Sequence, residues 1–183
     1  MLIMTSNQNK LAEFRRFGLP CEAFSGPDLA EIDSTDPRLV AIHKAINAGS
    51  GIIVEDTSLE IEGADLGTAI RWHLDDVESY IGSSASWRVC IAAVLDKRVF
   101  VAEGVVHGTI VNPVGDNIGA FGFDPWFSPD GSSGKTLHEL ELVRLKDVFS
   151  ARRLAVEAWL AGDFVINMFL DEIPPWQGGW QQE

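Results

Sequence analysis

The most distinctive pattern in the chain is the stretch EGVVHGTIVNPVGDNIGAFGFDPWFSPDGSSGKTLHEL, residues 103–140. Near its end stand Gly134, Lys135 and Thr136, the letters that also close a phosphate-binding P-loop. A P-loop needs a glycine five positions before Gly134, so that successive backbone N–H groups can wrap a phosphate. That position is Pro129, which has no N–H group and a fixed φ. Lys135 therefore needs an explanation other than a P-loop.

The residues around this stretch predict a hairpin followed by a loop and a helix. Two long strands are expected over residues 87–95 and 99–111, joined by a tight turn. Residues 112–124 are rich in glycine and predict a loop. Thr136 and Glu139 have the spacing of a capping box, which marks the start of a helix and accounts for Thr136 without a phosphate.

The rest of the chain predicts alternating strands and helices. A short buried strand at residues 2–4 leads through a polar turn into a helix over Asn9 to Phe17. Asp36 and Pro37 predict the start of a second helix. A buried strand at residues 52–54 follows, and Ser150 is expected to cap a last helix that ends at Leu160. The alternation, together with the long hairpin, predicts a mixed α/β fold, and no repeat or linker divides residues 1–183 into separate domains.

Composition narrows the class of protein. The 183 residues suit one domain with a sizeable core, and 46% of them are hydrophobic. The net charge of −13 argues against binding to nucleic acid or to anionic membranes through a basic surface. Cys21 and Cys90 form no metal-binding pattern, so buried free thiols in a reducing compartment are expected. No signal peptide or membrane span is evident, which predicts a cytoplasmic protein.

Polar clusters follow the two predicted buried strands near the N-terminus. Thr5, Ser6 and Asn7 offer hydroxyl and amide groups, with Lys10 one turn later; ordinary helix capping is the alternative explanation. Glu55 and Asp56 follow the strand at residues 52–54. Adjacent carboxylates at the end of a strand could hold Mg²⁺, a cation that prefers oxygen ligands. The alternative explanation is a turn whose carboxylates are exposed to solvent. The four histidines form no recognised catalytic pattern.

The C-terminal half offers an aromatic loop and further cations. Phe121, Gly122 and Phe123 could stack on a nucleobase, and Asp124 could accept a hydrogen bond from a base N–H. Taken alone, this segment could equally be a turn at the edge of the core. The basic residues of this half that could take part in a binding site are Lys135, Lys146, Arg152 and Arg153.

Four segments together resemble the inosine/xanthosine triphosphate pyrophosphatases, which hydrolyse non-canonical purine nucleotides. TSNQNKLAEF (5–14) is similar to T/S-G-N-x-x-K-x-x-E-F/L, and VEDTSLEIEGADLG (54–67) to A-D-D-S-G-L-x-V-D-A-L-x-G. Residues 103–140 follow G-x-x-G-x-I-x-x-x-P-x-G-x-x-G-F-G-Y-D-P-x-F-x-P-x-G-x-x-K-T-x-A-E-L. KDVFSARRLAV (146–156) resembles K-x-x-x-S-H-R-G-x-A-L. The match covers nearly the whole chain in order, and the third segment is the most specific.

The resemblance implies a two-lobed α/β architecture, with a long mixed sheet, flanking helices and a central nucleotide cleft. It implies Mg²⁺-dependent hydrolysis of a nucleoside triphosphate to monophosphate and pyrophosphate, and a homodimer. Asp56 would bind the metal and activate water, with Glu55 as a second metal ligand. The residues expected to bind the substrate are Thr5, Ser6, Asn7, Lys10, Thr57, Phe121, Gly122, Phe123, Asp124, Lys135, Lys146 and Arg152.

The sequence also departs from the family pattern. A glutamate of the family's E-N-A-x-x-K-A helix, expected to bind metal, aligns with Leu39. The histidine of S-H-R, which contacts the purine, aligns with Ala151, and the first aspartate of D-D-S-G is Glu55. Two hypotheses follow: an active pyrophosphatase with altered base selectivity, in which Glu55 replaces the missing ligand, or a nucleotide-binding protein whose hydrolysis is weakened.

Overall fold

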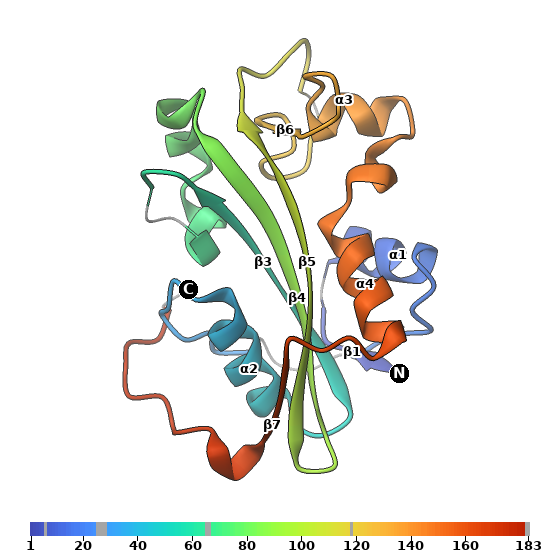
Figure 1. Cartoon of the computed structure of the whole chain (residues 1–183), viewed down its shortest axis with the longest axis vertical. Helices are drawn as coiled ribbons and strands as arrows, with labels where there is room; N and C mark the ends of the chain where they lie inside the picture. The colour runs from blue at the N-terminus through green and yellow to red at the C-terminus, as the bar shows by residue number, and fades with distance from the viewer. Residues whose placement is uncertain (6, 25–28, 65–66, 118, 182–183) are drawn as a thin grey trace.

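A computed structural model describes residues 1–183 except 6, 25–28, 65–66, 118 and 182–183 (Figure 1). Its centre is a sheet in the order β2-β1-β3-β4-β5-β6, with β7 also paired to β5. β1 is parallel to β2 and β3, and the other pairs are antiparallel. The predicted mixed α/β fold is thereby confirmed. The strands are β1 Leu2–Ile3, β2 Glu22–Ala23, β3 Ile52–Ile61, β4 Ser84–Leu95, β5 Arg98–Ile110, β6 Phe127–Pro129 and β7 Ile166–Phe169.

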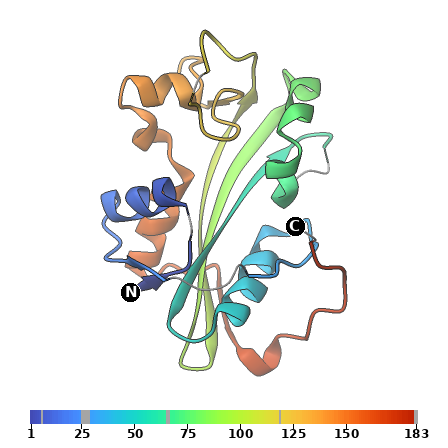
Figure 2. The same cartoon turned by 180° about the vertical axis from the view of Figure 1, so that it is seen from behind.

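Helices cover both faces of the sheet. Figures 1 and 2 show α1 and α4 together on one side and α2 on the other. The α-helices are α1 Gln8–Arg16, α2 Pro37–Ala48, α3 Leu137–Leu142 and α4 Ala151–Ala161. The 3₁₀ helices are η1 Gly67–Trp72, η2 Leu74–Tyr80, η3 Lys146–Phe149 and η4 Leu170–Glu172.

The predicted helix starts are confirmed by side-chain caps. Asp36 Oδ1 accepts hydrogen bonds from the N–H groups of Arg38 and Leu39 at the start of α2. Thr136 and Glu139 form the predicted capping box of α3. Ser150 accepts from the Arg153 N–H group and begins α4. These local signals set where each helix begins, and so which side chains it can present to the sheet.

Each face of the sheet has its own hydrophobic core. The core under α1 and α4 includes Ile3, Phe14, Ile53, Ile91 and Phe127. The core under α2 includes Ala41, Ala45, Val54, Ala92 and Val101. Burial of this apolar surface supplies the main force that holds the helices against the sheet.

Gly104 lets α4 approach β5 closely. A Cβ atom at this position would lie 2.1 Å from the Ala151 backbone oxygen and 2.5 Å from the Ala155 backbone nitrogen. Any side chain there would therefore push the first turn of α4 away from the sheet. Ala151 itself is fully buried beneath this contact.

The strand that carries Glu55 and Asp56 is longer than predicted. Instead of ending at Val54, β3 continues to Ile61 and pairs residue by residue with β4. The polar residues 55–58 do not end the strand, because β4 lies antiparallel beside them and supplies their backbone partners. Thr57, for example, pairs with Val89. The expected end of the strand at residue 54 is therefore wrong, and so is the alternative of a solvated turn.

The predicted hairpin is confirmed as β4 and β5, with Asp96 and Lys97 at positive φ in its turn. The tail holds an element that the sequence analysis did not predict: β7, whose Met168 lies opposite Val99 of β5. Cys21 and Cys90 are buried free thiols, as predicted. No helix in the described part of the chain is long and apolar enough to cross a membrane.

Candidate functional site

The candidate site lies on the two faces of β3. Successive side chains of a strand point to opposite faces, so Glu55 and Asp56 leave the sheet in opposite directions. Glu55 contacts α1 and α4, whereas Asp56 lies near Lys44 of α2. The two adjacent carboxylates therefore have different partners in this structure, and the metal site expected from the pair stays a prediction.

Glu55 is fully engaged by cations. Its Oε2 atom lies 2.7 Å from Lys10 Nζ, and its Oε1 atom lies 2.8 Å from Arg152 Nη2. Thr57 also donates a hydrogen bond to Oε1. Burial alone would raise the pKa of Glu55, but Lys10 and Arg152 outweigh it and hold this pKa well below its usual range.

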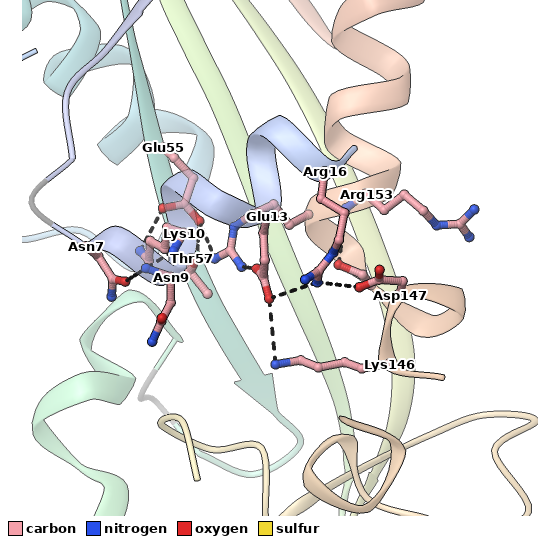
Figure 3. Close-up of polar contacts among 12 residues, drawn as sticks. Asn7, Asn9, Lys10, Glu13, Arg16, Glu55, Thr57, Lys146, Asp147 and Arg153 are labelled. Atoms are coloured by element: carbon pink, nitrogen blue, oxygen red, sulfur yellow. Dashed lines mark hydrogen bonds and ion pairs between the residues drawn. The ribbon is translucent and has the colours of Figure 1, made fainter. Parts of the chain in front are cut away.

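Glu13 extends this arrangement into a row of alternating charges. It accepts a hydrogen bond from Arg152 and lies 3.9 Å from Lys146 Nζ. Lys146 in turn lies 2.5 Å from Asp124 Oδ2. Figure 3 shows Lys10 beside Glu55, and Glu13 between that pair and Lys146. We call these six residues the ion-pair row: Lys10, Glu55, Arg152, Glu13, Lys146 and Asp124.

Helix starts place the members of the row. Asn7 Oδ1 accepts from the backbone N–H groups of Asn9 and Lys10 and begins α1. Lys10 and Glu13 are three residues apart on α1, a spacing that puts them on the same face of the helix. Glu13 was not predicted as a site residue, although it is the glutamate of the quoted T/S-G-N-x-x-K-x-x-E-F pattern.

The other face of β3 carries a sparser group that includes a residue missed by the sequence analysis. Asp56 Oδ1 lies 3.8 Å from Lys44 Nζ, which lies 2.6 Å from Glu31 Oε1. Asp56 Oδ2 is buried and has no hydrogen-bond partner among the described residues. We call Asp56, Lys44 and Glu31 the acidic group. Glu31 is the residue that was missed, because it lies in an irregular segment that carries no recognised motif.

The acidic group has unusual electrostatics. Burial raises the pKa of Asp56 to about 6, with Lys44 lowering it and Glu31 raising it. Burial would lower the pKa of Lys44, but Asp56 and Glu31 together raise it. A carboxyl group with a pKa near neutrality, buried beside a second carboxylate, is the kind of group that enzymes use for proton transfer.

The acidic group fits a hard divalent cation that is also held by substrate. Among the described residues, no three His, Cys, Asp or Glu side chains gather closely enough to hold a metal by themselves. Mg²⁺ commonly takes only one or two carboxylates, and water and substrate phosphates fill its other positions. Asp56 Oδ2 and the nearby Glu31 carboxylate match that requirement, whereas the oxygens of Glu55 already bind Lys10 and Arg152.

The predicted base-binding loop divides into exposed and buried parts. Phe121 is 42% exposed, so its ring can meet a ligand. Phe123 is buried and packs edge-on against Trp87 and Phe127, which makes it part of the core. Asp124 is buried, and burial raises its pKa although Lys146 acts in the opposite direction.

The remaining predicted substrate-binding residues that the structure describes lie outside its helices and strands. Lys135 is exposed, and its backbone carbonyl accepts a hydrogen bond from Ser132 Oγ. Thr5 Oγ1 accepts from the Asn7 N–H group, 3.2 Å away. Gly122 is exposed beside Phe121. Ser6 lies outside the described residues.

Two surface hollows lie away from these groups. One, of about 700 Å³, is lined by residues 1–2 and 18–22 together with Arg15. The other, of about 560 Å³, is lined by residues of β3, β4 and β5, among them Ser86 and His107. Neither contains a member of the ion-pair row or of the acidic group, whose charged side chains occupy the space between the elements they join.

Comparison with known proteins agrees with the resemblance in the sequence. The Ham1 family model matches residues 1–161. The dITP/XTP pyrophosphatase of Hyperthermus butylicus is 34% identical over 171 residues, which cover 83% of this chain and 88% of that protein. The inosine triphosphate pyrophosphatase of Giardia intestinalis is 33% identical over 178 residues, which cover 86% and 89%. The chain therefore belongs to the Ham1 family.

Proposed function

We propose that this protein hydrolyses a non-canonical purine nucleoside triphosphate to the monophosphate and pyrophosphate, with Mg²⁺ as cofactor. Water would attack phosphorus, the phosphoanhydride bond between the α- and β-phosphates would break, and pyrophosphate would leave. The names of the two relatives, each above 30% identity over most of this chain, support this reaction class. We further propose that residues 1–183 form one domain of this type.

The observation that carries the proposal is the division of charge across β3. One face gathers three cations, Lys10, Arg152 and Lys146, within one ion-pair row. The other face presents Asp56, with its raised pKa. Hydrolysis of a triphosphate needs both: positive charge to hold and neutralise the phosphates, and a group that accepts the proton of the attacking water. Lys10 and Glu55 are among the charges that act on Asp56, so the two groups are close enough for one triphosphate to meet both.

Each half has a distinct proposed task. Lys10, Arg152 and the exposed Lys135 would bind phosphate oxygens, since each is a cation that can donate several hydrogen bonds. Thr5, Asn7 and Thr57 would add neutral donors. Asp56 would accept the proton of water. Bound Mg²⁺, held by Asp56 with Glu31, would supply neutralisation of the charge that develops on the phosphates.

We assign Glu55 to the positioning of cations. To reach the same ion as Asp56, Glu55 would have to leave Lys10 and Arg152 and cross to the opposite face of β3. With its charge held by these partners, Glu55 instead keeps their nitrogens facing the place where phosphates would bind. Glu31 then supplies a carboxylate in place of the glutamate that the family pattern has at the position of Leu39.

The base would bind at the other end of the row. Phe121 offers an exposed ring for stacking, and Asp124, held by Lys146, offers a carboxylate to a base N–H. Ala151 stands where the family pattern has a histidine that contacts the purine, and a methyl group can donate no hydrogen bond. We therefore propose that base selectivity is altered relative to that pattern.

A second candidate function is nucleotide binding with weakened hydrolysis. It is favoured by Ala151, which removes a base contact, and by the ion-pair row, whose cations already have carboxylate partners. A nucleotide would have to compete with these carboxylates. Such a protein would bind triphosphates while releasing little pyrophosphate.

One experiment separates the two candidates. Pyrophosphate release would be measured with Mg²⁺ for ITP, XTP, dITP and the four common ribonucleoside triphosphates, alongside nucleotide affinity from calorimetry. Rapid release with one or more non-canonical nucleotides supports the pyrophosphatase. Tight binding without release supports the second candidate, and neither binding nor release would overturn both.

The resemblance also implies a cytoplasmic homodimer. We propose this state for the protein. Light scattering coupled to size-exclusion chromatography measures the mass of the particle directly, and a mass near the 20.0 kDa of one chain at micromolar concentration would contradict a dimer.

A further inference from the structure

The C-terminal tail lies beyond the part of the chain that resembles the family. The family model ends at residue 161, yet the structure describes the chain as far as Gln181. In both views the tail leaves β7, passes round the outer side of α2 and ends near the segment before α2 (Figures 1 and 2). That segment carries Glu31.

The end of the tail is bound to the backbone on both sides of Ile32, the residue next to Glu31. The Gln181 N–H group donates to the Glu31 backbone oxygen at 2.9 Å, and the Asp33 N–H group donates to the Gly179 oxygen at 2.9 Å. Between these bonds, Trp180 and Ile32 form an antiparallel bridge. Ile32 is only 1% exposed. The segment around Glu31 is therefore paired to the tail like a strand to its neighbour.

Trp176 anchors the tail to itself and to α2. Its Nε1–H group donates to the Gly179 oxygen at 2.7 Å, which closes a tight loop just before the paired residues. Its ring lies 5.9 Å from the His43 ring of α2, centroid to centroid. His43 is the neighbour of Lys44, so the tail contacts two of the three elements that build the acidic group, α2 and the segment of Glu31.

The contacts form a continuous path from the tail to Asp56. Gln181 fixes the backbone of Glu31, the Glu31 carboxylate holds Lys44 at 2.6 Å, and Lys44 lies 3.8 Å from Asp56 Oδ1. Glu31 stands in an irregular segment, where its side chain would otherwise be free to move. A carboxylate contributes to a metal site only when its position is held, which is usually the task of the residues around it.

We propose that residues 174–181 act as a positioning strap, which holds Glu31 and Lys44 in place beside Asp56 and so completes the cation-binding half of the site. This inference rests on the proposed function in that it assigns a divalent cation to the acidic group. It goes further in making the part of the chain outside the family pattern a working part of the site. The competing explanation is that the tail only adds stability.

The sharpest test removes one N–H group from the strap. Gln181→Pro deletes the donor to the Glu31 oxygen, while the matched variant Gln181→Ala keeps it. Binding of Mn²⁺ to the full chain without nucleotide, followed by electron paramagnetic resonance, reports on the acidic group directly. We expect Gln181→Pro to weaken Mn²⁺ binding about tenfold, the low end of what loss of supporting contacts costs a metal site. Gln181→Ala is expected to bind Mn²⁺ as the parent does.

Two further readouts separate positioning from stability. Amide exchange at Asp33 should become faster in Gln181→Pro, while the melting temperature changes little, because β7 remains paired. In turnover, kcat should fall while nucleotide affinity measured in EDTA stays the same. Asn167→Ala, which breaks a tail contact to Arg98 far from Glu31, serves as the control for a general loosening of the tail.

A double-mutant cycle tests whether the strap acts through Glu31. Truncation after Ile173 should weaken Mn²⁺ binding in the parent but add little in a Glu31→Gln background, because the carboxylate that the strap positions is then absent. Additive losses, unchanged Mn²⁺ binding in the truncated chain, or an intact chain that binds no Mn²⁺ would each overturn the proposal. If the parent releases no pyrophosphate from any nucleotide while the Mn²⁺ results hold, the proposed reaction fails and the strap stands.

Discussion

The two faces of β3 hold their carboxylates in opposite ways. On one face, Glu55 lies within 3 Å of Lys10 and Arg152, and their charges lower its pKa. On the other face, Asp56 has Lys44 at 3.8 Å, and burial raises its pKa to about 6. Two residues that are neighbours in the sequence thus stand in opposite electrostatic environments.

This difference indicates that the two carboxylates have different roles in the site. A buried carboxylate with close cations is held in its charged form and serves to fix those cations. A buried carboxylate whose charged form is poorly stabilised is ready to take up a proton or a cation. The first arrangement suits the binding of phosphates, and the second suits chemistry. Substitutions on the two faces should therefore fail in different ways.

The largest effect is expected from Asp56→Asn. The change keeps the shape of the side chain but removes its charge and its ability to accept a proton. Turnover measured by pyrophosphate release should fall about 1,000-fold, within the range for loss of a general base. Nucleotide affinity in EDTA should remain, because the ion-pair row is untouched. A variant that turns over at the parental rate would remove Asp56 from the proposed chemistry.

Glu55→Gln should instead damage the fold. It leaves Arg152 buried with less compensating charge, and breaking a buried ion pair in this way costs about 3 kcal/mol in the free energy of unfolding. We expect the low end of the usual range because Lys10 keeps some access to water. Urea denaturation measures the loss. If Glu55→Gln were as stable as the parent but lost its Mg²⁺ response, Glu55 would be a metal ligand after all.

The stability of the two faces should respond to pH with opposite signs. Because the folded-state pKa of Glu55 is lowered, its contribution is present above the ordinary glutamate pKa, about 4.3, and is lost as pH falls through the lowered value. Because the pKa of Asp56 is raised from 3.8 to about 6, its contribution is present below pH 3.8 and is lost as pH rises to about 6.

A comparison of variants isolates the Asp56 part of this pH dependence. Asparagine does not titrate, so the unfolding free energy of Asp56→Asn minus that of the parent should grow between pH 4 and 6, by roughly 2 kcal/mol. Above pH 6 the difference should stay constant. Urea titrations in EDTA at several pH values provide the measurement. A difference that shrinks over this interval would mean that the pKa of Asp56 is lowered.

Glu31→Gln should act on metal dependence with less effect on stability. Lys44 can still donate to the amide oxygen of glutamine, so the local hydrogen bond survives while one charge is lost. The Mg²⁺ concentration for half-maximal turnover should rise about tenfold. Leu39→Glu, which adds a carboxylate at the position that the family pattern emphasises, should change this value little. A large gain from Leu39→Glu would show that the present site lacks a ligand.

Much of the fold was predictable from local signals. Caps such as Asp36 and Ser150 mark helix starts through their own side chains, and the β4–β5 hairpin follows from long apolar alternation. The length of β3 was not predictable in this way. Polar residues such as Thr57 and Ser58 can continue a strand when a partner strand lies beside them. Here the partner is about 30 residues away in the sequence, and no local pattern reveals it.

The sequence predicted five of the six members of the ion-pair row, all but Glu13, but not their arrangement. The resemblance supplied Lys10, Lys146 and Arg152, and the structure brings them into one row with Glu13. The separation of Glu55 from Asp56 depends on a strand that runs through them, whereas the sequence predicted that the strand ends at residue 54. Glu31 was not predicted, because its role depends on a contact with Lys44. That contact joins an irregular segment to α2, and the sequence shows no sign of it.

The smallest effect is expected from Lys135→Ala, which tests the outer edge of the phosphate half. Lys135 is exposed and stands outside the ion-pair row, so its removal should leave the fold and the row intact. Its proposed partners are the outer phosphates. Affinity for a triphosphate should therefore fall about fivefold, less than for a buried charge-assisted hydrogen bond because solvent screens the exposed ammonium, while affinity for the monophosphate stays unchanged. Lys97→Ala, at the exposed turn between β4 and β5, removes the same charge elsewhere and serves as the control for the overall electrostatic field. Equal losses of affinity for triphosphate and monophosphate would show that Lys135 acts through its loop. Equal losses of affinity in both variants would show that Lys135 acts through general charge rather than by contact with the outer phosphates.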